Sequence, residues 1–321
     1  MIYIYTFLLS LLVGMFLTYL FLKIGNKYRL FDIAPEDDAL KIHKKPISYL
    51  GGSAMLLTSS VVLLSVAFLK NYLAKEIIYI ILAGLPIFAL GFWDDLRWKN
   101  IPQPKPYRKF ICLIIIPIIS VLILSLAGIR INFFGFLLLD YLVTFFYIFV
   151  LVNSVNYEDG IDGLAGGLVT LSFVTFIFLS LFFKNELGLF LSLSLSGSVM
   201  SFLVFNMPKA KIFMGDSGAF FLGYILSVFA MLFSKVYDII SLIGVLFILG
   251  FLVFEAVFTN IRRIINKKSI FLGDREHLYD ILYLRKRFSI KKTLFICYLL
   301  QVIFIIIGLI VLFYENTPFK T

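Results

Sequence analysis

The fold is decided by residues 139–183, LDYLVTFFYIFVLVNSVNYEDGIDGLAGGLVTLSFVTFIFLSLFF, in which two long apolar runs flank one short polar loop. Each run is close to the roughly 20 residues that a helix needs to cross the hydrocarbon core of a bilayer. The loop between them, residues 156–163, carries three carboxylates and two glycines. This stretch therefore predicts two membrane-spanning helices joined by an acidic turn.

The same pattern extends over all 321 residues, of which 61% are hydrophobic and 15% charged. Soluble proteins are nearer half apolar and about a quarter charged, so the excess apolar surface requires lipid. We predict an all-α polytopic integral membrane protein, with residues 1–321 forming a single membrane-embedded domain of about ten transmembrane helices. The first run lacks a preceding basic residue and a small-residue cleavage site, which predicts a retained span. The expected spans are Ile2–Leu22, Ser48–Leu69, Glu76–Phe92, Phe110–Ala127, Leu139–Val155, Leu164–Phe183, Leu187–Phe205, Gly218–Phe233, Ile239–Phe258 and Thr293–Phe313.

The distribution of charge predicts the orientation. Most of the 29 Lys and Arg residues fall in the loops at 23–47, 94–109, 207–217 and 259–292. Basic loops stay in the cytoplasm, so these loops are predicted to be cytoplasmic and both termini extracytoplasmic, in the inner (cytoplasmic) membrane. The net charge of +10 is accounted for by these loops, and we expect no nucleic-acid partner.

Acidic residues gather on the same predicted face. They come from three loops, each at the end of an apolar helix, where an ionisable group is costly and usually marks a functional site. Convergence of these loops produces a self-repelling cluster that a divalent cation offsets, and oxygen ligands favour Mg²⁺ or Mn²⁺ over zinc. The acids are Asp94, Asp95, Glu158, Asp159, Asp162 and Asp216.

Basic residues and glycines complete the pattern. Glycines beside the acids allow close backbone approach, and Lys or Arg beside metal-binding carboxylates is the equipment of phosphoryl transfer. Each feature also has a structural explanation: lipid anchoring for the bases, helix capping for the Asp94-Asp95 pair and helix packing for the glycines. Three acid–glycine loops on one face together favour an active site. The bases are Lys41, His43, Lys44, Lys45, Lys105, Arg108, Lys109, Arg262, Arg263 and Arg275.

From Lys41 to Asp280 the motifs follow a known order. They are Lys41-Ile-His-Lys-Lys-Pro with Gly51-Gly52, Asp94-Asp95, Asn153-x-x-Asn156-x-x-Asp159-Gly-Ile-Asp162-Gly-Leu, and Asn206 followed by Phe213-Met-Gly-Asp216-x-Gly. The chain resembles the polyprenyl-phosphate N-acetylhexosamine-1-phosphate transferases. That family includes phospho-MurNAc-pentapeptide translocase and the UDP-GlcNAc:undecaprenyl-phosphate GlcNAc-1-phosphate transferases, and its topology has ten spans with both termini outside.

The resemblance implies a role for each matching residue. Asp216 resembles the main Mg²⁺ ligand, with Asn156 beside it. Phe213 resembles the aromatic residue that stacks on uracil, and Lys109 a phosphate-contacting lysine, with Lys105 as its rival. The implied catalytic residues are Asp94, Asp95, Asp159, Asp162 and His277; the implied substrate-binding residues are His43, Lys45, Lys105, Lys109, Asn206, Phe213 and Arg275.

The resemblance also implies the reaction. A sugar-1-phosphate, of an N-acetylhexosamine, moves from a UDP-sugar to undecaprenyl or another polyprenyl phosphate with release of UMP, as the first membrane step of a cell-envelope polysaccharide pathway. Expected partners are these two substrates, membrane lipid and, as in other family members, a second copy of the chain. A single in-line displacement and a route through an aspartyl-phosphate intermediate both stay open.

The last cytoplasmic loop departs from the family pattern. It reads Asp274-Arg-Glu-His277-Leu-Tyr-Asp280, with one histidine where the family has a His-rich motif. The resemblance here is to the branch that begins O-antigen, lipopolysaccharide or capsule chains; phospho-MurNAc-pentapeptide transferase of peptidoglycan synthesis is the alternative. Glu255 replaces an aspartate of the family and is expected to pair with Arg262 or a loop lysine.

Two other classes of function fit less well. An ion-coupled transporter places its acids near mid-bilayer on broken helices, whereas here the acids lie on one face and only Glu255 approaches the bilayer interior. An alcohol phosphatidyltransferase needs Asp-Gly-x-x-Ala-Arg, and Asp162-Gly-Leu-Ala-Gly lacks the arginine.

Overall fold

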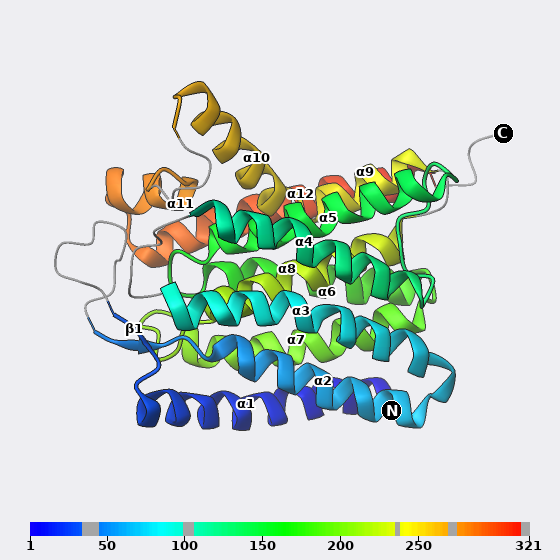
Figure 1. The fold of residues 1–321 in the computed structure, drawn as a ribbon, viewed down its shortest axis with the longest axis horizontal. Helices are drawn as coiled ribbons and strands as arrows, with labels where there is room; N and C mark the ends of the chain where they lie inside the picture. The colour runs from blue at the N-terminus through cyan, green and yellow to red at the C-terminus, as the bar shows by residue number, and fades with distance from the viewer. Residues whose placement is uncertain (34–44, 99–105, 235–237, 269–274, 316–321) are drawn as a thin grey trace.

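A computed structural model describes residues 1–33, 45–98, 106–234, 238–268 and 275–315, which form a bundle of long helices (Figure 1). The strands are β1 Phe31–Asp32 and β2 Ile47–Ser48. The helices are α1 Ile2–Tyr28, α2 Gly51–Leu69, α3 Ala74–Trp98, α4 Pro106–Ser125, α5 Leu137–Glu158, α6 Leu164–Phe182, α7 Glu186–Asn206, α8 Gly215–Phe233, α9 Ile239–Ile248, α10 Gly250–Ile265, α11 Leu278–Asp280 and α12 Ile290–Glu315, with short helical turns at Asn71–Leu73 and Ile281–Arg285.

Each predicted apolar run coincides with helical structure. Among the described residues, eight helices are long and apolar enough to cross a membrane, which confirms a multi-pass membrane protein. The apolar part of α4, Lys109–Ser125, is shorter than the other spans. The expected span Ile239–Phe258 is not one helix: it breaks at Leu249 into α9 and α10, bent by 86°.

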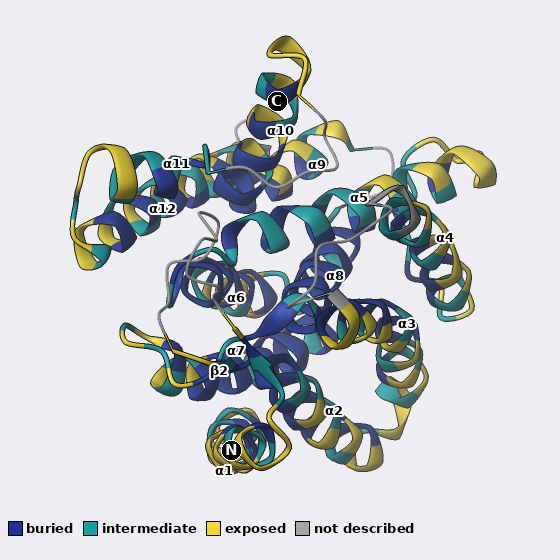
Figure 2. Cartoon of the chain, turned by 60° about the vertical axis from the view of Figure 1, so that its left-hand side comes forward, coloured by how far each residue is buried: buried dark blue, intermediate teal, exposed yellow. Residues whose placement is uncertain are grey.

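Helix α8 forms the centre of the bundle, and burial increases toward it (Figure 2). Of its most apolar 18-residue window, 89% is buried inside the protein. Small residues allow neighbouring helices to approach: a Cβ on Gly223 would lie 2.4 Å from the carbonyl oxygen of Leu151 in α5. The Tyr224 hydroxyl donates a hydrogen bond to the Ile80 carbonyl of α3 at 2.7 Å. This core fixes α8 relative to α3 and α5.

A two-stranded ribbon, absent from the all-α prediction, precedes α2. Strands β1 and β2 pair antiparallel, and Ser48 of β2 accepts a hydrogen bond from Phe213 N at 2.7 Å. Gly51 N and Gly52 N donate to the carbonyls of Phe213 and Met214, both at 2.9 Å. Helix α2 therefore begins at Gly51 rather than Ser48. The Gly51-Gly52 pair is required because a Cβ on Gly52 would lie 2.3 Å from the backbone nitrogen of α8 at Gly218.

The antiparallel arrangement brings the polar helix ends together. In Figure 1, β1 and α11 lie at the left-hand end of the bundle, whereas α1 begins and α12 ends at the right-hand end. The carboxyl ends of α3, α5 and α7 and the amino ends of α4 and α8 share the end with β1. The alternating direction of successive helices thus collects the predicted site residues at one end.

Candidate active site

Four polar side chains from four helices meet at the end of the bundle that carries β1. Lys109 Nζ, in the first turn of α4, lies 2.7 Å from Asp94 Oδ2 of α3 and 2.6 Å from Asp216 Oδ2 of α8. Asn156 of α5 donates from Nδ2 to Asp216 Oδ1 at 3.2 Å. Residues predicted to bind the metal, to contact phosphate and to act in catalysis are therefore in direct contact.

This cluster contains one ammonium group and two carboxylates. The side chains of Lys109, Asp94 and Asp216 are 23%, 10% and 17% exposed, so solvent screens them only partly. Two carboxylates this close repel each other, and the ammonium between them offsets the repulsion. In these contacts between described side chains, two carboxylates share one ammonium group, an arrangement that a divalent cation would suit as a further counter-ion.

Asp95 performs a different task from its neighbour Asp94. Its side chain is buried, its Oδ1 accepts from Asp216 N at 2.9 Å and its Oδ2 from Ser217 N at 3.0 Å. The first N–H groups of a helix lack partners within the helix, and a carboxylate there also meets the positive end of the helix dipole. Asp95 thus caps α8 from α3. It positions Asp216, and Gly215, whose φ is 72°, leaves room for it because a Cβ there would lie 2.5 Å from Asp95 Oδ2.

Asn206 and Asp162 tie two loops together. The buried Asn206 amide accepts from Gly163 N at 3.0 Å and donates to the Ile212 carbonyl at 2.9 Å. Asp162 Oδ2 accepts from Ala210 N at 2.9 Å. Both side chains, predicted to act on substrate or in catalysis, hold the loop after α5 against the segment before α8.

The other predicted residues lie around this cluster. Asp159 follows Asn156 by three residues and ends α5, where its side chain is half-buried. Phe213 is also half-buried, and its backbone pairs with β2. Lys45 is exposed just before β2. His43 and Lys105 lie outside the described residues.

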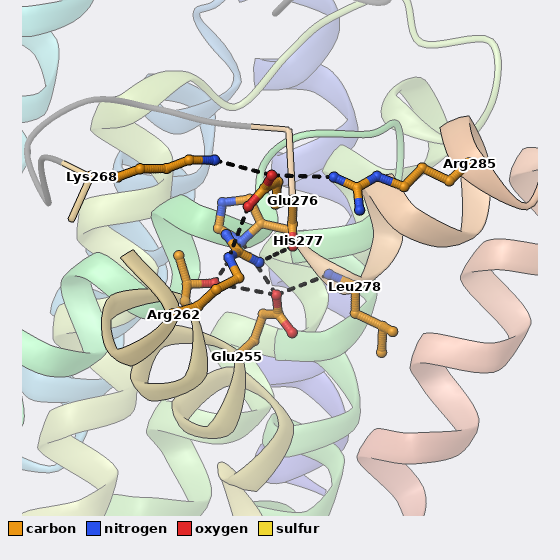
Figure 3. Close-up of polar contacts among 8 residues, drawn as sticks. Glu255, Arg262, Lys268, Glu276, His277, Leu278 and Arg285 are labelled. Atoms are coloured by element: carbon orange, nitrogen blue, oxygen red, sulfur yellow. Dashed lines mark hydrogen bonds and ion pairs between the residues drawn. The ribbon is translucent and has the colours of Figure 1, made fainter. Parts of the chain in front are cut away.

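A second cluster surrounds His277, beyond the break in the ninth span (Figure 3). The His277 side chain is buried, with Nδ1 3.3 Å from both Glu255 Oε1 and Thr259 Oγ1 of α10. Glu255 Oε1 also accepts from Leu278 N at 2.9 Å. The rings of His277 and Tyr279 stack with centroids 5.5 Å apart and planes 1° from parallel. Glu255 therefore contacts the His277 loop, whereas the sequence led us to expect that it pairs with Arg262 or a loop lysine.

Glu276 gathers basic residues on the outer side of the same loop. Its carboxylate lies 3.2 Å from Arg262 Nε, 3.1 Å from Lys268 Nζ and 3.2 Å from Arg285 Nη2, as Figure 3 shows. Arg262 also donates to the Glu276 carbonyl. The Lys268 and Arg285 side chains are 48% and 59% exposed, so those two ion pairs contribute little. Arg262 is the member that ties α10 to the loop.

Arg275, which the resemblance implies is a substrate-binding residue, forms an ion pair within its own loop. Its guanidinium lies 3.0 Å from Asp280 Oδ1, and the Asp280 side chain is fully buried. Burial raises the pKa of Asp280, while the neighbouring Arg275 acts in the opposite direction. In this conformation Arg275 stabilises the loop, and its role in substrate binding stays a prediction.

The two clusters are joined through the end of α5. Tyr157, next in sequence to Asn156, has its ring 5.4 Å from the His277 ring. The Arg263 guanidinium lies 5.4 Å from the centroid of the same Tyr157 ring. A Cβ on Gly160 would lie 1.9 Å from the Tyr279 hydroxyl, so the acidic turn needs glycine there. The loop of α11 thus packs directly on the turn that carries the predicted metal-site residues.

Comparison with known proteins identifies the family. The family model described as glycosyl transferase family 4 matches residues 77–234. A probable undecaprenyl-phosphate N-acetylglucosaminyl 1-phosphate transferase of Bacillus subtilis is 30% identical over 95% of this chain and 83% of its own length. The chain belongs to glycosyl transferase family 4. Its relatives include an undecaprenyl-phosphate alpha-N-acetylglucosaminyl 1-phosphate transferase of Thermotoga maritima, 29% identical over 94% of this chain and 89% of that one. A phospho-N-acetylmuramoyl-pentapeptide-transferase of Lactobacillus acidophilus is 32% identical over 66% and 69%.

The family match divides the site. It covers Asp94, Lys109, Asn156 and Asp216, and it ends before α9, so the His277 loop lies beyond it. All four residues of the first cluster thus lie inside the matched region. The second cluster belongs to the part of the chain that the family model does not describe.

The first cluster fits Mg²⁺. Magnesium is usually held by one or two carboxylates, with water and substrate phosphates completing an octahedron. Asn156 donates from Nδ2 to Asp216 Oδ1, so its amide, which also carries an oxygen, lies beside that carboxylate; the Asp94 carboxylate is joined to Asp216 through Lys109. No group of three or more His, Cys, Asp or Glu side chains in the described residues forms a metal cage by itself. Asp216, Asp94 and Asn156 would supply protein ligands to an ion whose remaining positions are filled by water and substrate phosphates.

Two members of the second cluster were not predicted from sequence. Thr259 follows Glu255 by four residues and so shares its helix face, which is a detectable signal once α10 is known to be helical. Glu276 directly precedes His277. The basic residues near it in the sequence could have indicated that it forms several ion pairs. The π-type turn at Ile281–Arg285, which directs Arg285 back toward Glu276, has no sequence signal that we recognise.

Proposed function

We propose that this protein transfers an N-acetylhexosamine-1-phosphate from a UDP-sugar to undecaprenyl or another polyprenyl phosphate, with release of UMP. The observation that carries the proposal is the contact of Lys109 with both Asp94 and Asp216, beside Asn156, at one end of a membrane-embedded bundle. The relatives' names describe transfer of a sugar 1-phosphate to undecaprenyl phosphate, and the family model covers these four residues.

The chemistry requires two anions to be brought together. A lipid monophosphate is largely dianionic at neutral pH, because its second pKa is near ~6, and it is already a nucleophile. One pair of unit charges about 4 Å apart repels by about 4 kcal/mol at an effective dielectric of about 20. Bound Mg²⁺ supplies charge neutralisation at the diphosphate. Lys109 supplies a second positive charge within reach of the same carboxylates.

The roles of the chain's residues follow from their contacts. Asp216 and Asn156 would hold the metal, and Lys109, now between the two carboxylates, would contact a phosphate oxygen of the bound substrate. Asp94 keeps the lipid phosphate deprotonated, since Asp95 uses both carboxylate oxygens on the backbone of α8. Phe213 stacks on uracil, and Asp159 orients the donor. His277 contacts the sugar from the α11 loop.

A single in-line displacement accounts for transfer. A lipid-phosphate oxygen attacks the β-phosphorus of the UDP-sugar, the new P–O bond forms, and the bond to UMP breaks. The rival route places the phosphosugar on Asp94 before the lipid attacks. Incubation of the purified protein with labelled donor and no lipid distinguishes them: a labelled protein adduct contradicts the single displacement.

The donor is proposed to be UDP-GlcNAc or a 6-deoxy relative. The N-acetylglucosaminyl relatives match over 94–95% of this chain, whereas the pentapeptide-transferase of Lactobacillus acidophilus matches over 66%. The loop also supplies one histidine, His277, stacked on the flat face of Tyr279, which suits a small, partly apolar sugar. A donor with a lactyl-peptide needs more polar partners. The product then enters an envelope polysaccharide such as O-antigen or lipopolysaccharide, or a cell-wall polymer.

The position of the first cluster also supports a proposal about the location of the active site. The cluster lies at one end of the bundle, and the basic loops of that end indicate the cytoplasmic face of the inner membrane. We propose that the active site faces the cytoplasm, as a UDP-sugar donor requires, and that both termini lie outside.

The test is release of UMP by the purified protein in detergent with undecaprenyl phosphate, Mg²⁺ and a panel of UDP-sugars. Release with UDP-GlcNAc or its 6-deoxy relatives supports the proposal. Turnover of UDP-MurNAc-pentapeptide alone shows that the protein belongs to the peptidoglycan branch. Absence of UMP release with every donor, from protein that is folded, contradicts the transferase proposal.

A further inference from the structure

A single buried side chain joins the two sides of the break between α9 and α10. At a helix break, the last carbonyls of one helix and the first N–H groups of the next lack helical partners. Gln301 of α12 donates from Nε2 to the Ile248 carbonyl at 2.9 Å and accepts at Oε1 from Phe251 N at 3.3 Å. Its side chain is fully buried. One primary amide thus satisfies a carbonyl of α9 and an N–H of α10 at once.

Packing from α12 supports the same corner. Phe304, one turn after Gln301, has its ring 6.3 Å from the Phe247 ring of α9 and 6.0 Å from the Phe254 ring of α10. A Cβ on Gly250, the first residue of α10, would lie 2.4 Å from Phe304 Cδ1. The Phe304 ring therefore fills the inside of the bend, and the Gln301 amide forms hydrogen bonds with the backbone groups at the break.

The direction of α10 decides where Glu255 lies. Glu255 is six residues after Leu249, about 9 Å along the helix axis. A change of about 20° in the bend displaces a point at that distance by about 3 Å. The contacts of Glu255 with His277 Nδ1 and Leu278 N are 3.3 Å and 2.9 Å long, so such a displacement breaks both.

We infer that Gln301 is a positioning residue for the His277 loop: it fixes the bend between α9 and α10, and through that bend the contact of Glu255 with His277. Gln301 does not touch the site and is not itself catalytic. The link to turnover rests on the proposed function, but the link to the bend does not, and the two are tested separately.

The bend is measured by electron paramagnetic resonance between spin labels at two exposed positions, Ile243 of α9 and Ile261 of α10, with Cys112 replaced by Ser. Eighteen residues of straight helix span about 27 Å, whereas a near-right-angled bend at Leu249 brings the two backbones to about 20 Å. In the labelled protein with Gln301 intact, we expect a narrow distribution of label-to-label distances at the shorter distance. Gln301→Met should broaden it and lengthen its mean by about 3 Å or more.

Ser172 provides the matched control. Gln301 Nε2 also lies 3.0 Å from Ser172 Oγ of α6, a contact that does not involve the break. Ser172→Ala should leave the distance distribution unchanged. If Gln301→Met does not fold, Gln301→Glu replaces it, because it keeps the acceptor for Phe251 N and removes the donor to Ile248. A narrow, unshifted distribution in a folded Gln301 variant overturns the inference.

Turnover gives the second measurement, through a double-mutant cycle with Glu255→Gln. Each single variant should lower kcat/KM for the UDP-sugar by about tenfold or more, and the double variant should lose no more than the worse single variant, since both act on the same contact. If the losses of the two single variants multiply in the double variant, Gln301 only stabilises the fold, and its positioning role is overturned. Absence of turnover in the unsubstituted protein contradicts the proposed function and leaves the spin-label result standing.

Discussion

Replacement of Lys109 by Met tests whether this lysine stands where a metal ion enters. In the structure its ammonium group lies within 2.7 Å of Asp94 Oδ2 and 2.6 Å of Asp216 Oδ2, so it is the internal counter-ion of both carboxylates. Methionine keeps most of the side-chain length and removes the charge. The variant therefore leaves two facing carboxylates without the cation between them.

The magnitude follows from the distances. The two carboxylate oxygens are no more than about 5 Å apart, and two unit charges at that separation repel by about 3 kcal/mol at an effective dielectric of about 20. In the variant, binding of Mg²⁺ relieves this repulsion, whereas in the unsubstituted protein Lys109 already does so. A difference of about 3 kcal/mol corresponds to roughly a hundredfold tighter apparent binding of Mg²⁺.

The assay is thermal unfolding in detergent over a Mg²⁺ titration, because a ligand that binds only the folded state raises the unfolding temperature with its concentration. Lys109→Met should unfold at a lower temperature without Mg²⁺ and should gain more from Mg²⁺ than the unsubstituted protein. Its transferase activity should fall at least a hundredfold, since no ammonium remains for the substrate phosphate. Lys211→Met, at an exposed lysine before α8, should change none of these. An equal or smaller Mg²⁺ response in Lys109→Met refutes the reasoning.

Four further outcomes are expected. Asp216→Asn should abolish UMP release while the protein still inserts, because charge is lost with little volume; full activity of this variant, or of the unsubstituted protein in excess EDTA, contradicts the metal assignment. Asp95→Ala should lower the free energy of unfolding by about 2 kcal/mol through loss of the α8 cap, and a stability equal to the parent's contradicts that role. Cysteines at the exposed Lys209 and Asn71 should react with a membrane-impermeant reagent from the cytoplasmic and the outer face respectively; labelling of both from one face breaks the topology. His277→Ala should cut turnover strongly with the best donor, as measured by UMP release.

The first cluster could be predicted from sequence because its geometry is dictated by topology. Apolar runs of span length alternate in direction, so acids at the carboxyl ends of α3 and α5 and at the amino end of α8 must share one end of the bundle. The motifs then select Asp94 and Asp216 among these acids, together with the amide Asn156. Sequence did not reveal which acid of the Asp94-Asp95 pair faces the cluster, because that depends on the rotation of α3 about its axis.

The second cluster was predicted less well because it depends on a break that hydropathy does not report. Residues 239–258 form one apolar run, and nothing in their composition requires a bend of 86°. The bend arises from tertiary contacts with Gln301 and Phe304 of α12, more than 40 residues later in the chain. Without it, Glu255 has no reason to face His277, and a pairing with Arg262 on its own helix is the reasonable expectation.

These two origins of structure correspond to two tasks of the site. The family match at residues 77–234 includes Asp94, Lys109 and Asp216, and relatives named for different donors are similar to this chain, so we expect the phosphoryl chemistry to depend on this region. The α9–α12 region, which holds the loop around His277, lies beyond the matched residues. We therefore expect changes in this region to alter the sugar that is accepted without moving Asp94 and Asp216, the carboxylates proposed to act at the metal. Donor preference should accordingly transfer with residues 239–315 in chimaeras between family members, while the dependence on Mg²⁺ stays with the recipient bundle.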